Sequence, residues 1–236
     1  MTAPHKDDFG KPVGLPIENW SGCEFPPRTD MTGRHVIVSP IDVERDAQQL
    51  FDANGKAADG SRFTYLSTHA FDDFASYKAW LVGMAANADP MLHTIIDVAT
   101  NKAVGVAAFM RIDAANGVVE IGNINYAPAL SKTIGGTEAM YLMMKRAFDE
   151  LGYRRYEWKC DDHNAPSRAA AARYGFSYEG TFRNHMVYKG RNRDTAWFSI
   201  TVEEWPALRT AFEAWISPDN FDETGAQRKR LQDLRG

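Results

Sequence analysis

The chain has few of the features of proteins that disulfides or metal ions hold together, or of proteins embedded in a membrane. Its 236 residues include only two cysteines, Cys23 and Cys160, which lie far apart and outside any CxxC pair. This spacing argues against a disulfide framework and against a zinc site, so no metal is expected. No run of about 18 apolar residues is present, and the N-terminal stretch lacks the apolar segment of a signal peptide. A cytoplasmic protein is therefore the expectation.

The chain also lacks a large excess of either charge. Its 27 Lys and Arg residues against 31 Asp and Glu residues give a net charge of −4, so neither nucleic acid nor a membrane is an expected partner. Hydrophobic residues make up 44% of the chain, which is ordinary for a globular protein. This length and composition allow a buried core without disulfide or metal staples.

The spacing of apolar residues predicts one mixed α/β domain over residues 34–216. Residues 1–33 are rich in proline, glycine and polar residues, which indicates an extended arm lying on the domain, and residues 217–236 form a polar, mobile C-terminal tail. Strands are predicted at 35–38, 91–98, 103–112, 118–126, 154–159, 176–188 and 195–202. Helices are predicted at 43–54, 71–87, 136–151, 165–174 and 203–216.

This order of elements, together with three short motifs, resembles the GNAT superfamily of acetyl-CoA-dependent N-acetyltransferases. The first motif is the strand Val118–Tyr126 followed by Gly135-Gly-Thr-Glu-Ala-Met140 at a helix start. The second is Asn164-Ala-Pro-Ser167, and the third is Tyr174-Gly-Phe176 with Glu179-Gly180 after it. Together they are similar to the branch that includes the ribosomal-protein alanine N-acetyltransferases. The resemblance implies a mixed, mostly antiparallel central sheet of about seven strands flanked by helices.

The segment Ser131–Gly136 takes the place of the family's pyrophosphate loop but departs from its pattern. The family loop runs Arg/Gln-x-x-Gly-x-Gly/Ala, whereas this chain reads Ser131-Lys-Thr-Ile-Gly-Gly136. A helix start offers unpaired backbone N–H groups and a positive dipole end, both of which favour a diphosphate. The predicted cofactor contacts here are Lys132, Thr133, Ile134, Gly135, Gly136 and Thr137. The alternative is structural: Thr137 caps the helix and the two glycines only form a turn.

The strand Val118–Tyr126 is expected to supply further contacts. In the family, the corresponding strand splays from its neighbour and pairs with the pantetheine arm, a role that falls here to Ile124, Asn125 and Tyr126. Glu120 is the candidate general base on the same strand, because its sequence neighbours are apolar and partial burial would raise its pKa. The alternative is a Glu on a solvated strand face.

Asn164 and Ser167 form the second predicted cluster. Asn164 suits a helix N-cap, and the resemblance implies a cofactor contact for both residues. Ser167 resembles the general acid that protonates the leaving thiolate, since Ala171 stands where other branches have a Tyr. We predict that Glu138 is a first-turn acid that stabilises its helix, and that His163 is a surface residue.

These residues predict an N-acetyltransferase that moves an acetyl group from acetyl-CoA to a primary amine by direct transfer in a ternary complex. The acceptor is either a peptide N-terminus or a small-molecule amine, with Phe63, Tyr65, Trp80, Arg183 and His185 in the variable regions that would contact it. A homodimer is left open. The alternative function is a non-catalytic acyl-CoA-binding sensor or interaction module, which the departure at Ile134 favours.

Overall fold

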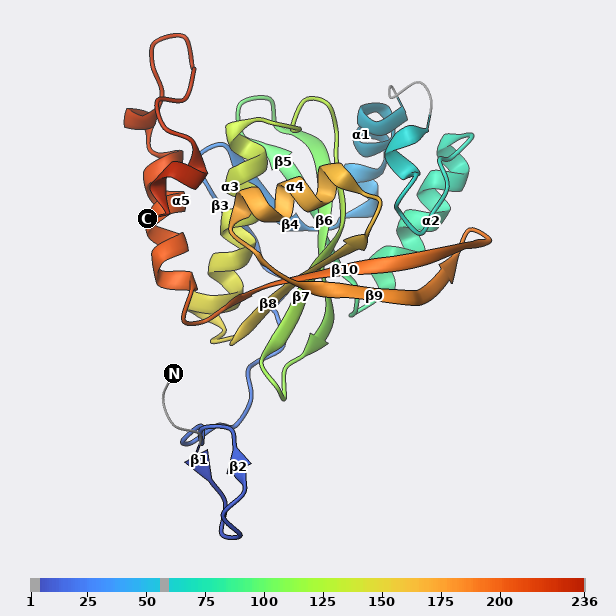
Figure 1. The fold of residues 1–236 in the computed structure, drawn as a ribbon. Coiled ribbons are helices and arrows are strands. Elements are labelled where there is room, and N and C mark those ends of the chain that lie inside the picture. Colours follow the sequence, from blue (N-terminus) through green and yellow to red (C-terminus); the bar gives the residue numbers. More distant parts are fainter. Residues whose placement is uncertain (1–4, 56–59, 236) are drawn as a thin grey trace.

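An eight-stranded sheet runs through the middle of the molecule, with helices on both of its faces (Figure 1). The computed structural model describes residues 5–55 and 60–235, so residues 1–4 of the predicted arm, 56–59 of the predicted domain and 236 of the predicted tail lie outside the description. The strands are β1 (His5–Lys6), β2 (Pro12–Val13), β3 (Met31–Thr32), β4 (Val36–Pro40), β5 (Met91–Asp97), β6 (Lys102–Asp113), β7 (Val118–Tyr126), β8 (Arg155–Asp161), β9 (Ser177–Tyr188) and β10 (Arg191–Thr201). The α-helices are α1 (Val43–Gly55), α2 (Phe74–Ala86), α3 (Ile134–Lys145), α4 (Ala165–Tyr174) and α5 (Trp205–Ile216), with a π-helical turn η2 (Arg146–Glu150) and 3₁₀ turns η1 (Ser61–Phe63), η3 (Pro218–Asn220) and η4 (Leu231–Leu234).

The order of strands in the sheet confirms the predicted mixed, mostly antiparallel fold. It runs β3-β4-β5-β6-β7-β8-β10-β9, and each neighbouring pair is antiparallel except β7 and β8. The seven predicted strands are β4 to β10. The eighth strand, β3, comes from the arm, where two residues are too few to show a period of hydrophobicity.

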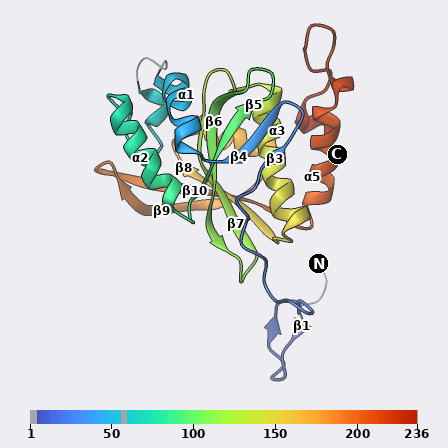
Figure 2. The ribbon, with the colours of Figure 1, turned by 180° about the vertical axis from the view of Figure 1, so that it is seen from behind.

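The helices form two layers, each with its own apolar core (Figures 1 and 2). Helices α1 and α2 pack Leu50 and Tyr77 against Leu92 of β5 on one face of the sheet. On the other face, α3, α4 and α5 bury a larger aromatic and methionine-rich core that includes Met140 and Phe212. The sheet is therefore held rigidly from both sides, which fixes the ends of its central strands.

Strands β7 and β8 separate partway along their length, as the resemblance implied. Their parallel pairing runs from Val118 opposite Arg155 to Ile121 opposite Trp158. Beyond that point β7 stays paired with β6 only, through an irregular register in which Asn123 has a left-handed φ of 49°. Asn tolerates this conformation better than most residues, and such a bulge bends the strand. One edge of the last residues of β7 is thereby left without a β8 partner.

The structure divides the predicted arm into two parts. Strands β1 and β2 form a hairpin that projects away from the body of the molecule (Figure 1). From Trp20 onward the arm lies on the domain: the Trp20 indole donates to the carbonyl of Ala115 at 2.9 Å, and the backbone N–H of Cys23 donates to that of Ala114 at 2.8 Å. The expectation of an arm that lies on the domain thus describes its second part.

The polar tail after α5 is folded onto the domain rather than extending from it. Leu231 of η4 is 1% exposed, and Arg235 donates to the carbonyl of Ala172 in α4 at 3.0 Å. The Trp215 indole donates to the side chain of Gln227 at 2.9 Å, which ties the tail to α5. The expectation of mobility considered only the polar composition of the tail, whereas these long-range contacts fix its position.

Candidate functional site

A cavity of about 850 Å³ occupies the space where β7 and β8 diverge. This large cavity is bounded by the end of β7, the loop before α3, the first turns of α3 and α4, and the tail. Its lining residues are Arg62, Ile124, Asn125, Tyr126, Ser131, Lys132, Thr133, Ile134, Gly136, Thr137, Met140, Trp158, Asn164, Pro166, Ser167, Ala169, Ala170, Arg173, Tyr174, Trp215, Phe221, Gly225 and Gln227. All predicted cofactor contacts are among them except Gly135.

The loop before α3 places the start of that helix on the wall of the large cavity. Helix α3 begins at Ile134, two residues earlier than predicted, because the Thr133 hydroxyl caps it by accepting from the backbone N–H of Gly136 at 3.1 Å. The structural alternative had assigned this cap to Thr137. Thr137 lies in the first turn instead, where its hydroxyl accepts from Arg173 at 3.1 Å. Lys132 adopts a left-handed φ of 63° at the rim.

The two glycines of this loop have different surroundings. A Cβ at Gly136 would lie 2.7 Å from the Leu130 carbonyl oxygen, so only glycine lets the helix start approach that backbone. A Cβ at Gly135 would meet the Val36 side chain at 2.9 Å. Gly135 therefore packs toward β4, away from the large cavity, whereas Gly136 lies on its wall.

The free edge of β7 forms one wall of the large cavity through Ile124, Asn125 and Tyr126. Arg62, from η1, donates to the carbonyl of Tyr126. The Tyr126 hydroxyl is buried and has no hydrogen-bond partner among the described residues. Burial raises the pKa of this phenol well above its ordinary value, so the ring stays neutral.

The start of α4 forms the opposite wall. The Asn164 side chain accepts from the backbone N–H of Ser167 at 3.1 Å, so the predicted N-cap is present. The Ser167 hydroxyl accepts from the Trp158 indole at 2.9 Å. The same hydroxyl lies within hydrogen-bonding reach of the Cys160 thiol, and Ser167 lines the large cavity.

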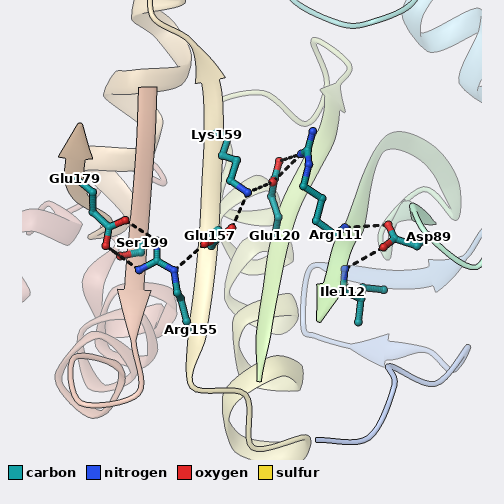
Figure 3. A network of polar contacts seen from close by, with 9 residues as sticks. All are labelled: Asp89, Arg111, Ile112, Glu120, Arg155, Glu157, Lys159, Glu179 and Ser199. Carbon is teal, nitrogen blue, oxygen red and sulfur yellow. Dashed lines mark hydrogen bonds and ion pairs between the residues drawn. The ribbon is translucent and has the colours of Figure 1, made fainter. Parts of the chain in front are cut away.

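Glu120 lies in a row of alternating charges rather than among apolar side chains (Figure 3). It is 3% exposed, and its carboxylate contacts Arg111 Nη1 at 2.7 Å and Lys159 Nζ at 2.9 Å. Lys159 also contacts Glu157 at 2.6 Å, and Arg155 joins Glu157 to Glu179. We call these six residues (Glu179, Arg155, Glu157, Lys159, Glu120 and Arg111) the charge ladder. Expecting apolar neighbours was wrong because sequence neighbours on a strand point to the opposite face.

Glu138 has a role that its position in the helix did not reveal. It is 4% exposed, and its carboxylate accepts from the backbone N–H groups of Arg34, His35 and Val36 at 2.9, 2.6 and 3.0 Å. The prediction that it only stabilises its own helix was therefore wrong. It anchors the start of β4 to α3, a contact across about a hundred residues that no local pattern could show.

Several residues of the large cavity come from segments that the sequence did not connect with it. Arg62 precedes α2, Trp158 lies on β8, and Arg173 lies at the end of α4. Trp215, Phe221 and Gln227 belong to α5 and the tail. The chain folds them together only in three dimensions, so periodicity and local motifs carried no signal for them.

A second cavity, of about 220 Å³, adjoins the large one. This small cavity lies between the segment after η1, helix α2 and the strands β6 and β7. Its lining residues are Phe63, Leu66, Ser67, Thr68, Tyr77, Trp80, Met84, Pro90, Val106, Met110, Asn123 and Asn125. Asn125 lines both cavities, so they meet at the bulged end of β7. Of the residues predicted for acceptor contact, Phe63 and Trp80 line the small cavity.

The described residues, 5–55 and 60–235, hold neither a metal site nor a membrane-spanning helix. In that part of the chain no three His, Cys, Asp or Glu side chains gather as a metal site would require. No helix there combines the length and apolar character needed to cross a membrane.

Comparison with known proteins places this geometry in a family. The Acetyltransferase (GNAT) domain matches residues 35–177, more than half of the chain. The chain belongs to this family. GNAT acetyltransferases use acetyl-CoA as co-substrate, so the predicted family and its type of acyltransferase are confirmed.

Similar proteins extend the match over most of the fold. A GCN5-related N-acetyltransferase from Brucella melitensis is 46% identical with a TM-score of 0.91, over 93% of this chain and 99% of that one. A GNAT-family protein from Chromobacterium violaceum is 38% identical with a TM-score of 0.77, over 83% and 98%. The uncharacterised N-acetyltransferase p20 of Bacillus licheniformis is 30% identical over 112 residues, 48% of this chain. That match spans 62% of p20, less than two thirds of its length.

Proposed function

We propose that the protein is an N-acetyltransferase that moves the acetyl group of acetyl-CoA directly to a primary amine. The observation that carries the proposal is the large cavity. It brings together the free edge of β7, the opened start of α3 and the N-cap of α4, which lie on three separate segments of the sequence. A cavity of about 850 Å³ lies within the range of roughly 300–1,000 Å³ that suits a large organic ligand.

The chemistry of the walls fits acetyl-CoA along the length of the large cavity. The backbone N–H groups at the start of α3 and the cation of Lys132 would hold the diphosphate. The free edge of β7, from Ile124 to Tyr126, would pair with the pantetheine amides as an added strand does. Arg173 and Trp215 would contact the nucleotide end, with the tail residue Phe221 beside them.

Ser167 is the proposed general acid. Ser167 lines the large cavity, and its hydroxyl would turn its proton from the neighbouring Cys160 toward the thiolate of CoA and so help it to leave. Glu120 is proposed as the general base, acting through water, because its carboxylate is held by Arg111 and Lys159 and lines neither cavity. The acceptor amine would enter where the two cavities meet, at Asn125.

Direct transfer is favoured over an acetyl-enzyme intermediate by the state of the two thiols. Cys160 is 5% exposed, and burial raises the pKa of its thiol above the ordinary value. The Cys23 thiol pKa is also raised by burial, and this residue lies on the arm. A protonated thiol is a poor nucleophile, so neither cysteine is suited to carry the acetyl group. Both are free, which suits the reducing cytoplasm.

A homodimer is part of the proposal. The edge strand β9 exposes Tyr178, Phe182 and Val187 to solvent, and the arm exposes Phe9 and Leu15. Apolar surface of this kind is often covered by another chain. Sedimentation velocity over a range of protein concentrations tests this point, and a single monomer species at every concentration contradicts it.

The transferase proposal is tested in two steps with the full chain. Thermal unfolding with and without acetyl-CoA should show a shift at millimolar cofactor, because a ligand that binds only the folded state stabilises it. Release of free CoA thiol is then followed with a panel of primary amines and short peptides. Release with at least one acceptor supports the transferase. Binding without release from any of them supports the alternative, a non-catalytic acyl-CoA-binding module.

A further inference from the structure

The small cavity lies where an acceptor must approach. Asn125 separates it from the large cavity, and one segment walls both, with Arg62 on the large side and Phe63 on the small side. That segment is tied to the body of the molecule at three points. Arg62 donates to the carbonyl of Tyr126, Tyr65 donates to that of His163 at 3.1 Å, and Lys189 donates to that of Phe63 at 2.6 Å. The small cavity therefore has fixed walls.

The walls of the small cavity are apolar and aromatic. Phe63 and Tyr77 are buried, with exposures of 8% and 2%, and both stack edge-on against Phe71 behind them. The Trp80 indole and the flexible side chain of Met84 complete the α2 side. Such surfaces gain free energy by covering apolar groups of a ligand, at roughly 25 cal/mol per Å² removed from water.

No charged side chain occurs among the described residues that line the small cavity. Its polar side-chain groups are all uncharged: the hydroxyls of Ser67, Thr68 and Tyr77, the Trp80 indole N–H, and the amides of Asn123 and Asn125. A charged group of the acceptor would lose its hydration there without gaining an ion pair, which is costly. Two cations, Arg62 on the dividing segment and Lys189 against it, are bound to backbone carbonyls and would repel further positive charge.

The size of the small cavity limits what enters. Its 220 Å³ is below the roughly 300–1,000 Å³ of pockets that enclose a whole drug-sized ligand. It holds one ring or branched aliphatic group together with the nearby amine. The rest of a larger acceptor must lie outside.

From these observations, and resting on the proposed transferase function, we infer that the small cavity selects acceptors whose primary amine is joined to an uncharged, apolar group. An amine next to an aromatic or branched aliphatic side chain fits this description. Polycationic acceptors, such as polyamines and aminoglycosides, do not, because no carboxylate among the described lining residues would pair with their charges.

The test compares acceptors that differ only in the group beside the amine. The value of kcat/KM is measured at saturating acetyl-CoA for phenylalaninamide, leucinamide, lysinamide and spermidine. We expect the two apolar amides to exceed lysinamide and spermidine by about tenfold or more, as an apolar pocket rejects an unpaired charge. Equal or better use of lysinamide or spermidine overturns the inference.

A pair of variants on α2 locates the selection in the small cavity. Met84→Asp places a carboxylate in its wall, whereas Val82→Asp places one two residues away at a side chain that is 51% exposed and does not line the cavity. Met84→Asp should lower kcat/KM for phenylalaninamide about tenfold and leave the KM for acetyl-CoA unchanged, while Val82→Asp changes neither. Equal behaviour of the two variants overturns the inference. Ser67→Asp, on the exposed part of the wall, replaces Met84→Asp if that variant does not fold.

A binding measurement separates failure of this inference from failure of the transferase proposal. If no acceptor gives thiol release, 2-phenylethylamine is titrated into the protein with CoA present, and tryptophan fluorescence reports occupancy beside Trp80. Saturable binding that Met84→Asp loses and Val82→Asp keeps supports the apolar site even in a protein that does not turn over. Absence of such binding to the unmodified protein overturns it.

Discussion

The large and small cavities adjoin at one residue but are built in different ways. At the centre of the large cavity, the groups proposed to bind the cofactor are backbone groups: the free edge of β7, the capped start of α3 and the capped start of α4. Side chains such as Arg173, Trp215 and Phe221 form the wall farther out. The small cavity is lined by residues of η1 and the segment after it, of α2 and of the strands β6 and β7, and its aromatic and apolar side chains set its character. A backbone wall depends on where helices and strands begin and end, whereas a side-chain wall depends on which residue stands at each position.

This difference suits the two proposed ligands, because the cofactor is always the same molecule whereas the acceptor amine can differ. A site of backbone N–H and C=O groups tolerates many side chains around it, as long as the glycine and the caps are kept. A site of Trp, Met and Phe side chains changes its ligand with a single substitution. We therefore expect changes in the large cavity to alter cofactor binding and turnover, and changes in the small cavity to alter only which amine is used.

The strongest test of this comparison adds one carbon atom where the start of α3 approaches the preceding loop. In Gly136→Ala the new Cβ would lie 2.7 Å from the Leu130 carbonyl oxygen, so the loop and the helix start must move apart. We expect the Kd for acetyl-CoA, measured by isothermal titration, to rise more than about 100-fold. The reason is that the backbone N–H groups at the start of α3 would no longer point at the same diphosphate position.

The matched control for that change is Gly83→Ala. Gly83 lies within α2, where a Cβ would meet nothing within 4 Å. It should bind acetyl-CoA normally and gain up to about 1 kcal/mol in free energy of unfolding, as Ala does over Gly in a helix. Normal binding by Gly136→Ala would show that the large cavity does not depend on this backbone approach.

The second change asks whether the charge ladder serves the reaction. Glu120→Gln should lower kcat/KM by about 100-fold, if the carboxylate accepts a proton from the amine through water. Glu157→Gln is the matched control, because Glu157 is also buried and also contacts Lys159. Equal losses of kcat/KM in both variants would mean that the charge ladder is structural.

The sequence predicted the backbone groups of the large cavity better than the side chains around them. Lys132, Thr133 and the cap Asn164 were found because caps and loop glycines are written in consecutive residues. Arg173 and Phe221 were not, since their place at the large cavity depends on how α4 and the tail pack. Likewise the partners of Glu120 come from neighbouring strands, whose register only the folded sheet defines.

A third change tests the acid proposed on α4. Ser167→Ala should lower kcat about tenfold and leave the KM for acetyl-CoA within about twofold, because a thiol with a pKa near 8.5 needs little help to leave. Ser167→Thr is the control, since it keeps a hydroxyl at this position while it changes the side chain by one methyl group. An unchanged kcat in Ser167→Ala would mean that Ser167 is not the general acid and serves only the start of α4.

The smallest effect is expected at the far end of the large cavity, where side chains rather than backbone form the wall. Phe221 of the tail stands edge-on to Trp215 with ring centroids 5.4 Å apart, and both line the large cavity. Phe221→Ala should raise the KM for acetyl-CoA about threefold with kcat unchanged, the size of one lost aromatic contact of roughly 0.5–1.5 kcal/mol. Phe9→Ala, at an arm residue that is 87% exposed and lies outside both cavities, is the control. A change in kcat instead of KM would place the tail in the catalytic step, and the division between a backbone-built centre and a side-chain-built periphery would not hold.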